Sequence, residues 1–463
     1  MKANLTSSPE VSADLLARYD RPGPRYTSYP TALALTEDIG AATYAEHLAA
    51  AADASLAAEP LSVYVHMPFC EHRCSFCACH AIEPRSHEAT LPYLDDLCAE
   101  IEMVAAALGD RRSVAQYHWG GGTPTYYSPD ELRRLQRSFD RHFSRVPGAE
   151  WSVEADPRVT TEAHVEALVE MGFNRISIGV QDLDAGVQAA IGRHQTEAQT
   201  HALVDAARRH GFASINLDLV YGLPGQDMTT FRSTLARTVA LGPDRLAVFS
   251  FAHLPGDRPN QRRIETAAVP VPRAKLEMFA EAVTFLTSAG YVWIGMDHFA
   301  RPDDELVTAQ AEGRLHRNFM GYTIARADDL VGLGASAIGD VAGGYFQNHK
   351  HLRAYHGAID AGEPATAKGY VRTRDDDVRR YVITSLMCNR GVRWAEVAAR
   401  FGVDPHAYFA SELDSLGSGD LADLVSTGPD AVELTELGAL FPRTVAMAFD
   451  PGVPPRPTLG AQP

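Results

Sequence analysis

Short apolar runs alternate with longer amphipathic stretches through the first two thirds of the chain. The runs are rich in β-branched residues, as strands are, and lie at residues 62–67, 114–119, 150–154, 174–180, 214–220 and 245–251. The stretches with helical spacing lie at residues 90–108, 129–144, 161–171, 184–210, 228–241 and 271–289. Such alternation forms a parallel sheet covered by helices. Six successive units predict an α/β fold with a partial (β/α)6 barrel rather than a full eight-fold one.

The remaining segments predict further parts of the chain. Residues 1–43 contain RPGPRYTSYPTA, whose prolines disfavour helix and strand, and are expected to form an N-terminal arm. Residues 44–360 are assigned to the barrel and its C-terminal extension, with loops and short helices expected over 296–360. Residues 372–450 are expected to form a small, mainly helical domain. The proline-rich tail, 451–463, is expected to be disordered.

Composition and charge narrow the possible partners. The chain has 463 residues, 45% hydrophobic and 22% charged, which is typical of a globular protein. It has no run of the ~20 apolar residues that a membrane helix needs. Its first residues have no apolar signal-peptide core, so a cytoplasmic protein without a membrane partner is expected. The net charge of −17, without a long basic run, disfavours nucleic acid.

Unusual residues recur where the predicted strands end, which is where parallel barrels bind ligands. The features, in chain order, are the cysteine-rich loop, GGGTP (120–124), Glu154, Gln181, Asp218, and Ala252 with His253. Their regular placement predicts one site at one rim of the barrel. The sequence has no intact G-x-G-x-x-G after a strand and no Walker A motif, which disfavours nicotinamide dinucleotides and ATP.

The segment CEHRCSFCAC, residues 70–79, holds four of the six cysteines. Thiolates at this density bind zinc or an iron–sulfur cluster. Structural zinc usually takes ligands from two separated knuckles, and no second knuckle follows, although His72 or His80 could complete a zinc site. Three cysteines in C-x3-C-x2-C spacing can hold three irons of a [4Fe–4S] cluster and leave the fourth open. The spacing favours that cluster, with Cys79 as a possible closing ligand.

Other candidates allow a structural and a functional interpretation. GGGTP is either a tight turn whose glycines permit close packing or a set of backbone N–H groups open to a carboxylate. Asp218, in an apolar strand, needs either a structural partner or a ligand hydroxyl, and Glu154 poses the same choice. His298, in GMDHFARPDDE, is more often structural than catalytic.

At this point the motifs resemble a known family. CEHRCSFC and GGGTP resemble the cluster and glycine-rich motifs of radical S-adenosylmethionine (SAM) enzymes. Within that superfamily the chain resembles the oxygen-independent coproporphyrinogen III oxidases over residues 18–450. The segments that carry the likeness are RPGPRYTSYPTA, YVHMPFCEHRCSFCAC, YHWGGGTPTY, FNRISIGVQD, DLVYGLPGQ, GMDHFARPDDEL and LHRNFMGYT.

The resemblance implies one [4Fe–4S] cluster on Cys70, Cys74 and Cys77, and two SAM molecules. Matching residues at the first SAM are Tyr64, Gly121, Glu154 and Ile338. Those at the second are Phe76, Gly122, Thr123, Gln181, Arg193, Asp218 and Ala252. Tyr64 and Cys79 are the implied catalytic residues. Ser75 and His80 depart from the types frequent in the family, which affects only the surroundings of the cluster.

The resemblance also implies a reaction. The reduced cluster cleaves SAM, the 5′-deoxyadenosyl radical takes hydrogen from a propionate, and loss of CO2 and one electron leaves a vinyl group. Two propionates of coproporphyrinogen III react in this way, with an external one-electron donor and a monomeric enzyme. Because the substrate is anionic, Arg25, His298, Arg301 and Arg317 are candidates for binding it, and solvated or structural roles are the alternatives.

Two competing functions follow from the same motifs. Haem chaperones of the superfamily share the three cysteines, GGGTP and YGLPGQ, but typically lack the fourth cysteine and resemble this chain less at the arm. The presence of Cys79 and RPGPRYTSYPT favours the oxidase. The second alternative is a structural zinc protein without catalytic activity.

Overall fold

The computed structural model of the chain describes residues 13–19, 21, 23–325, 327–417 and 421–453. It divides into two compact units. The barrel unit comprises residues 34–289 and 325–371, and the composite unit comprises residues up to 33, 290–324 and from 372 onward. These boundaries differ from the expected ones, because segments from three parts of the chain form the composite unit. Most of the tail expected to be disordered lies outside the described residues.

The barrel unit contains the six predicted parallel strands, which pair in chain order. They are β1 (Leu61–Met67), β2 (Ser113–Gly121), β3 (Ser144–Ala155), β4 (Arg175–Gln181), β5 (Ser214–Tyr221) and β6 (Arg245–Ser250). Alternation of strand and helix thus predicted this part of the fold correctly. The carboxyl ends of the strands lie along one edge of the sheet, as the single-site prediction requires.

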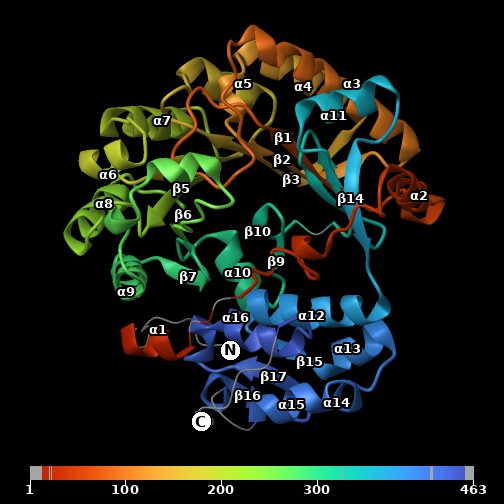
Figure 1. Cartoon of the computed structure of the whole chain (residues 1–463). Coiled ribbons are helices and arrows are strands. Elements are labelled where there is room, and N and C mark those ends of the chain that lie inside the picture. The colour runs from red at the N-terminus through yellow and green to blue at the C-terminus, as the bar shows by residue number, and fades with distance from the viewer. Residues whose placement is uncertain (1–12, 20, 22, 326, 418–420, 454–463) are drawn as a thin grey trace. The chain divides into compact units, whose positions relative to one another are not determined.

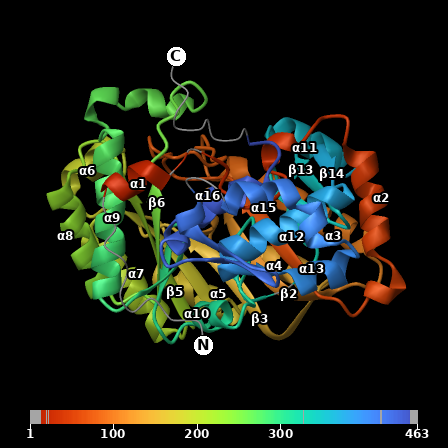
Figure 2. The same ribbon diagram turned by 90° about the horizontal axis from the view of Figure 1, so that it is seen from below.

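Helices cover the outer face of this curved sheet (Figure 1). They are α2 (Ala41–Ala51), α3 (Leu91–Ala107), α4 (Pro129–Asp140), α5 (Glu162–Glu170), α6 (Ala185–Ala190), α7 (Glu197–Arg209), α8 (Met228–Ala240) and α9 (Pro272–Ser288). Figure 2 shows α8 and α9 beside the β5–β6 end of the sheet and α2 and α3 beside the opposite end.

The stretch 184–210, predicted as one helix, is two. Helix α6 ends before Gly192, whose φ of +64° is left-handed, and Thr196 caps the start of α7 through the backbone N–H of Gln199. Gly192 and the capping box of Thr196 and Gln199 are stop and start signals for helices, and the prediction of a single helix overlooked them. The break places Arg193 in a loop at the carboxyl edge of the sheet.

The expectation of loops and short helices over 296–360 is wrong in part. Strand β11 (Leu330–Leu333) pairs in parallel with β1, and β12 (Ile338–Val341), β13 (Gly344–Asn348) and β14 (Thr366–Val371) extend the sheet in antiparallel fashion. Helix α11 (Leu352–Asp360) connects the last two strands. These strands are short and rich in glycine. A Cβ at Gly332 would lie 2.8 Å from the backbone of Ile338, so glycine permits the close approach of β11 and β12.

An aromatic cluster fills the core between β2, β3 and their helices. The rings of Tyr117 and Phe139 stack with centroids 4.1 Å apart, and Trp119 lies 4.5 Å from Phe173. Tyr117, Trp119 and Phe139 are fully buried. This packing holds the strands whose carboxyl ends carry GGGTP and Glu154.

The composite unit confirms a mainly helical C-terminal domain. Its helices are α1 (Ala13–Tyr19), α10 (Glu305–Ala311), α12 (Arg374–Asn389), α13 (Trp394–Phe401), α14 (Pro405–Tyr408), α15 (Ala410–Gly417) and α16 (Pro442–Ala446). Its strands form the hairpins β7–β8 (Val292–Gly295, His298–Ala300) and β9–β10 (His316–Asn318, Gly321–Thr323) and the sheet β15–β17–β16 (Gly391–Arg393, Ala431–Leu434, Val425–Thr427). Across the residues described in both units, none of the helices has the length and apolar character to span a bilayer.

Candidate cluster and cofactor site

The cysteine loop leaves β1 and closes on itself through backbone hydrogen bonds. The N–H of Cys70 donates to the carbonyl of Ile82 at 3.0 Å, and the N–H of Ile82 donates to that of Pro68 at 2.7 Å. Cys74 is buried, Cys70 and Cys77 are half-buried, and Cys79 is exposed. The loop therefore presents three thiols that are buried or half-buried, and Cys79 is the most exposed residue of the four.

The glycines of GGGTP bring the end of β2 against the base of this loop. The N–H of Gly122 donates to the carbonyl of Met67, and that of Thr123 to the carbonyl of Phe69, both at 2.8 Å. A Cβ on Gly122 would lie 2.4 Å from the carbonyl oxygen of Pro68. The close-packing interpretation of the motif is therefore confirmed.

The same contacts correct the functional interpretation of GGGTP. The N–H of Gly121 donates to Oε2 of Glu154 at 3.0 Å. The amides of Gly121, Gly122 and Thr123 all have protein acceptors, so they are not N–H groups open to a ligand carboxylate. The side chain of Thr123 instead faces the loop, and its hydroxyl donates to Sγ of Cys70 at 3.4 Å.

Two neighbouring amide side chains hold the backbone of the cysteine loop from the opposite side. They lie in the 3-10 helix η5 (Pro259–Arg263), in the segment after β6. The side-chain nitrogen of Asn260 donates to the carbonyls of Cys74 (3.1 Å), Ser75 (3.0 Å) and Cys77 (2.9 Å). That of Gln261 donates to the carbonyls of Phe76 (2.8 Å) and Ala252 (3.0 Å). This pair was not predicted, since an Asn-Gln dipeptide in a loop has no distinctive pattern.

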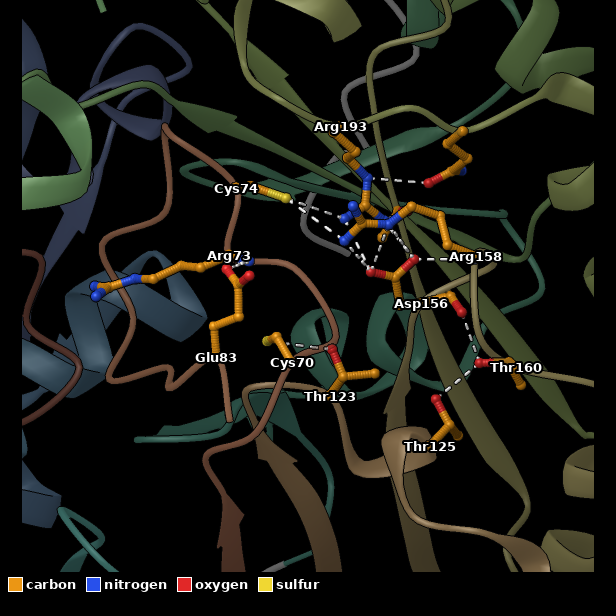
Figure 3. Close-up of polar contacts among 12 residues, drawn as sticks. Cys70, Arg73, Cys74, Glu83, Thr123, Thr125, Asp156, Arg158, Thr160 and Arg193 are labelled. Carbon is orange, nitrogen blue, oxygen red and sulfur yellow. Dashed lines mark hydrogen bonds and ion pairs between the residues drawn. The ribbon is translucent and has the colours of Figure 1, made fainter. Parts of the chain in front are cut away.

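Two arginines that share one aspartate approach the buried thiol of Cys74 from one side (Figure 3). Asp156 forms ion pairs with Arg158 at 2.6 Å and with Arg193 at 3.1 Å. Each arginine also places a guanidinium nitrogen 3.6 Å from Sγ of Cys74. Arg193 was predicted as a site residue, but Asp156 and Arg158 were not. Their position directly after Glu154, at the end of a barrel strand, is the signal that would have found them.

Hydrogen bonding also acts on two other thiols. A hydrogen bond from Cys79 lowers the pKa of the Cys77 thiol and raises the pKa of Cys79. Burial raises the pKa of Cys70 to about 12, and the hydrogen bond from Thr123 opposes that effect. The hydrogen bond thus favours Cys77 as the thiolate of the Cys77–Cys79 pair.

A second set of polar groups surrounds Glu154. Burial raises the pKa of this carboxyl, but hydrogen bonding and charge from His118 and the Gly121 amide outweigh burial and lower it. The ring of Tyr64 stacks on His118 with centroids 5.8 Å apart, and its hydroxyl lies 2.9 Å from Nδ1 of His66. The structure therefore brings the predicted residues Tyr64 and Gly121 close to the ionised carboxylate of the predicted residue Glu154.

The other predicted cofactor residues lie at neighbouring strand ends. Asp218 accepts hydrogen bonds from Ser177 (2.9 Å) and Asn216 (2.7 Å), which hold its carboxylate on β5. Gln181 has a left-handed φ of +67° at the end of β4. Phe76 packs against an apolar cluster of Val187, Ile191, Val220, Leu223, Phe251 and Ile264. Ala252 is exposed after β6, and Ile338 is half-buried at the start of β12.

The candidate substrate residues lie in the composite unit, where three of them surround Asp297. Arg25 forms an ion pair with Asp297, His298 Nδ1 lies 2.7 Å from its Oδ1, and Arg317 donates to the carbonyl of Arg25 at 2.8 Å. Burial raises the pKa of the Asp297 carboxyl group. The charges of His298, Arg25 and Arg317 outweigh this effect and lower that pKa well below its usual range. Arg301 is exposed after β8. The structure thus groups Arg25, His298 and Arg317 around Asp297.

The residues of the cysteine loop fit a [4Fe–4S] cluster. In the described part of the chain, no three His, Cys, Asp or Glu side chains are arranged around a single metal ion. A [4Fe–4S] cluster is instead held by several Cys thiolates, and hydrogen bonds and charge near the sulfur atoms tune its reduction potential. Cys70, Cys74 and Cys77 provide the thiols, while Thr123 and the two arginines provide the donors and charge.

Comparison with known proteins agrees with this geometry. The chain matches the family model of the radical SAM superfamily over residues 64–237 and that of the HemN C-terminal domain over 373–441. It is 43% identical over 444 residues to an oxygen-independent coproporphyrinogen III oxidase of Pseudomonas aeruginosa, covering 96% of each chain. Identity to that of Escherichia coli K12 is 43% over 436 residues, or 94% of each chain.

The solved structure of coproporphyrinogen III oxidase (HemN) from Escherichia coli, described as a radical SAM enzyme, superposes with a TM-score of 0.88. It covers 93% of this chain and 98% of that chain at 43% identity. The fold and site therefore define a radical SAM enzyme, which implies a [4Fe–4S] cluster and SAM and removes the zinc alternative. Within that superfamily, the chain belongs to the family of oxygen-independent coproporphyrinogen III oxidases.

Proposed function

We infer that this chain converts two propionate side chains of coproporphyrinogen III to vinyl groups without oxygen, giving protoporphyrinogen IX in haem biosynthesis. The observation that carries this inference is the sheltered three-thiol loop at the carboxyl edge of the barrel, in a chain 43% identical to named oxidases over almost all of its length. The reaction is inferred from membership of the family, and the position of the cluster is inferred from the cysteine loop.

Cys70, Cys74 and Cys77 are the proposed cluster ligands. When bound, the cluster and SAM supply the one-electron and radical chemistry that removes hydrogen from a propionate. The protein holds the loop from three sides, through the end of β2, through Asn260 and Gln261, and through Arg158 and Arg193. Partial burial of the thiols restricts the access of water to the site.

Two SAM molecules are proposed, at neighbouring parts of the same edge. Tyr64, Gly121, Glu154 and Ile338 are assigned to the first, where the ionised Glu154 suits an ammonium group. Phe76, Gly122, Thr123, Gln181, Arg193, Asp218 and Ala252 are assigned to the second, where the oriented Asp218 suits ribose hydroxyls. Equilibrium dialysis with labelled SAM should give two equivalents per chain and one for Asp218→Asn. One equivalent for the parent protein would contradict the second site.

Arg25, His298, Arg301 and Arg317 are proposed to bind substrate propionates. Two guanidinium groups and a histidine gather around Asp297, and guanidinium groups bind carboxylates such as propionates through charge-assisted hydrogen bonds. Arg317→Gln should raise the KM for coproporphyrinogen III with less effect on kcat. Arg314→Gln is the matched control, because Arg314 lies nearby in sequence and pairs with Glu312 on the exposed surface. An unchanged KM for Arg317→Gln would remove that residue from the proposal.

The remaining partners follow the family. We propose a cytoplasmic monomer that takes electrons from an external one-electron donor and has no nucleic-acid or membrane partner. Light scattering during gel filtration tests the monomer, and a stable dimer would contradict it. A haem-binding chaperone is the competing function within the superfamily, and Cys79 argues against it.

One anaerobic assay tests the function as a whole. Reconstituted protein is incubated with reductant, SAM and coproporphyrinogen III, and the product is oxidised and followed by porphyrin fluorescence. Protoporphyrin, 5′-deoxyadenosine and CO2 are expected. Cleavage of SAM without decarboxylation, together with stoichiometric haem binding, would favour the chaperone instead.

A further inference from the structure

Arg158, one of the residues that hold the cysteine loop, contacts the thiol of a proposed cluster ligand. It follows Asp156 by two residues, in the connection from β3 to α5. Its Nε lies 3.0 and 3.1 Å from the two carboxylate oxygens of Asp156, and a terminal nitrogen lies 3.6 Å from Sγ of Cys74. The contact with sulfur is therefore made by a guanidinium group that Asp156 holds in place.

Arg193 repeats this arrangement from another element. Its two terminal nitrogens each lie 3.1 Å from an oxygen of Asp156, and one of them lies 3.6 Å from the same sulfur of Cys74. Figure 3 shows the two guanidinium groups converging on the carboxylate with the thiol beside them. One carboxylate thus orients two cations toward one thiol.

This group is buried and carries an excess of positive charge. The side chains of Arg158, Arg193 and Asp156 are 13%, 5% and 10% exposed. The other hydrogen-bond acceptors of Arg193, the Gly179 carbonyl and the Gln195 side chain, are neutral. Burying two cations with one anion is unfavourable unless a further anion is present. An anionic thiolate-bound cluster at Cys74 would provide that anion.

We propose that Arg158, together with Arg193, raises the reduction potential of the cluster through Cys74, and that Asp156 limits the size of this effect. The proposal rests on the proposed assignment of the cluster to the three cysteines. In the redox step the external donor loses one electron and the cluster gains it, so the cluster becomes more negative by one unit. Nearby cations and hydrogen bonds to sulfur stabilise the reduced state more than the oxidised state.

Redox titration of the reconstituted protein, followed by electron paramagnetic resonance, tests the proposal. Arg158→Gln keeps hydrogen-bond donors but removes the charge, so its midpoint potential should become more negative. A tenfold loss in the equilibrium constant for one-electron reduction, about 59 mV, is the expected scale. Arg158→Lys should retain most of the parent potential. Asp156→Asn removes the carboxylate and should shift the potential in the opposite direction.

Arg133→Gln is the matched control for a lost positive charge. Arg133 lies on α4 and pairs with Glu170 and Asp130, apart from the cysteine loop. Its removal should leave the potential, cluster content and basal activity of the parent. A control shift equal to that of Arg158→Gln would overturn the proposal, since the effect would then be one of net charge.

The outcomes separate this proposal from the proposed function. A parent protein that takes up no cluster would refute the function itself. An intact cluster with an unchanged potential in Arg158→Gln would overturn only the role of Arg158. If Arg158→Gln takes up no cluster, Asp156→Asn decides: a more positive potential supports the proposal, and an unchanged or more negative one overturns it. If neither variant holds a cluster, Arg158 and Asp156 have a structural role only, and the proposal is overturned.

Discussion

The side-chain nitrogen of Asn260 lies 2.9 Å from the carbonyl oxygen of Cys77, although 183 residues separate them along the chain. The same nitrogen also reaches the carbonyls of Cys74 and Ser75. Beside it, Gln261 holds the carbonyl of Phe76. Every carbonyl from residue 74 to residue 77 therefore faces an amide donor from η5, which constrains the loop that presents the thiols.

Asn260→Asp should lower cluster content more than Asn260→Ala does. Aspartate places a carboxylate against three carbonyl oxygens, whereas alanine only leaves them without the donor. A lost donor to buried acceptors costs about 1–3 kcal/mol, and the carboxylate adds repulsion. Iron and sulfide per chain after anaerobic reconstitution measure the effect. Equal cluster content in all three proteins would show that Asn260 does not position the loop.

Gly122→Ala should destabilise the protein and reduce cluster uptake. The new Cβ would lie 2.4 Å from the carbonyl oxygen of Pro68, where backbone must move, and overpacking of this kind costs about 1–3 kcal/mol. The control is Gly357→Ala, in the exposed middle of α11, where a Cβ meets nothing within 4 Å. That change should stabilise the protein by about 0.5–1 kcal/mol. Urea unfolding of the cluster-free protein compares the two, and a neutral Gly122→Ala would contradict the packing argument.

Cys79→Ser should keep most of the cluster and lose turnover of coproporphyrinogen III. Cys79 is exposed and donates to Cys77, whereas Cys70, Cys74 and Cys77 are at least half-buried. Replacing any of those three by serine should abolish the cluster. Iron content and anaerobic activity are measured side by side for Cys79→Ser and Cys77→Ser. If both variants lost iron to the same extent, the division between ligands and fourth cysteine would be wrong.

Glu100 should make the barrel unit less stable as pH rises from about 4.5 to 7. It is buried on α3 and accepts hydrogen bonds from Tyr355 (2.7 Å), Asn348 (2.6 Å) and the Gly334 amide (2.6 Å). Burial raises its pKa from 4.5 to about 7, despite those bonds. Between these values the folded state keeps a proton that the unfolded state has released. Stability from this proton is complete below pH 4.5 and is lost as pH rises through 7, a change on the order of 3 kcal/mol.

The measurement is the free energy of unfolding of cluster-free protein across this pH range. Glu100→Gln cannot titrate, so its stability should depend less on pH than that of the parent. His356→Gln serves as a control for a titrating group on the surface, since His356 is exposed and pairs with Asp96. Identical pH slopes for the parent and Glu100→Gln would contradict the assigned pKa.

The fold could be predicted where local pattern and tertiary structure agree. The six parallel strands and their helices have a strong period, and the C-x3-C-x2-C spacing marks the cysteine loop. Strands β11 and β12 escaped prediction because glycines such as Gly332, needed for close strand contact, remove the β-branched signal. The break between α6 and α7 was missed although Gly192 and the capping box of Thr196 and Gln199 mark it in the sequence.

The site residues could likewise be predicted where the local sequence pattern marks them. Glu154, Asp218 and the cysteines are conspicuous as polar or reactive residues at the ends of apolar strands. Asn260 and Arg158 act on the loop through space, from segments whose composition is ordinary for a surface loop. Asn260 is revealed only by its three-dimensional contacts, because the carbonyl groups that it binds are far away in the sequence. Arg158 also contacts a distant residue, but its place shortly after Glu154, at the end of a strand, was a usable signal.

The pairing of β1 with β11, in which Ser62 lies opposite Leu330, has a consequence for synthesis on the ribosome. β2 to β6 emerge soon after β1 and can pair in succession. The other edge of β1 cannot pair until β11 has been synthesised, when most of the polypeptide has been made. An unpaired parallel edge is prone to associate with other chains. The nascent chain therefore passes through a long interval in which its first strand, next to the cysteine loop, has one unpaired edge.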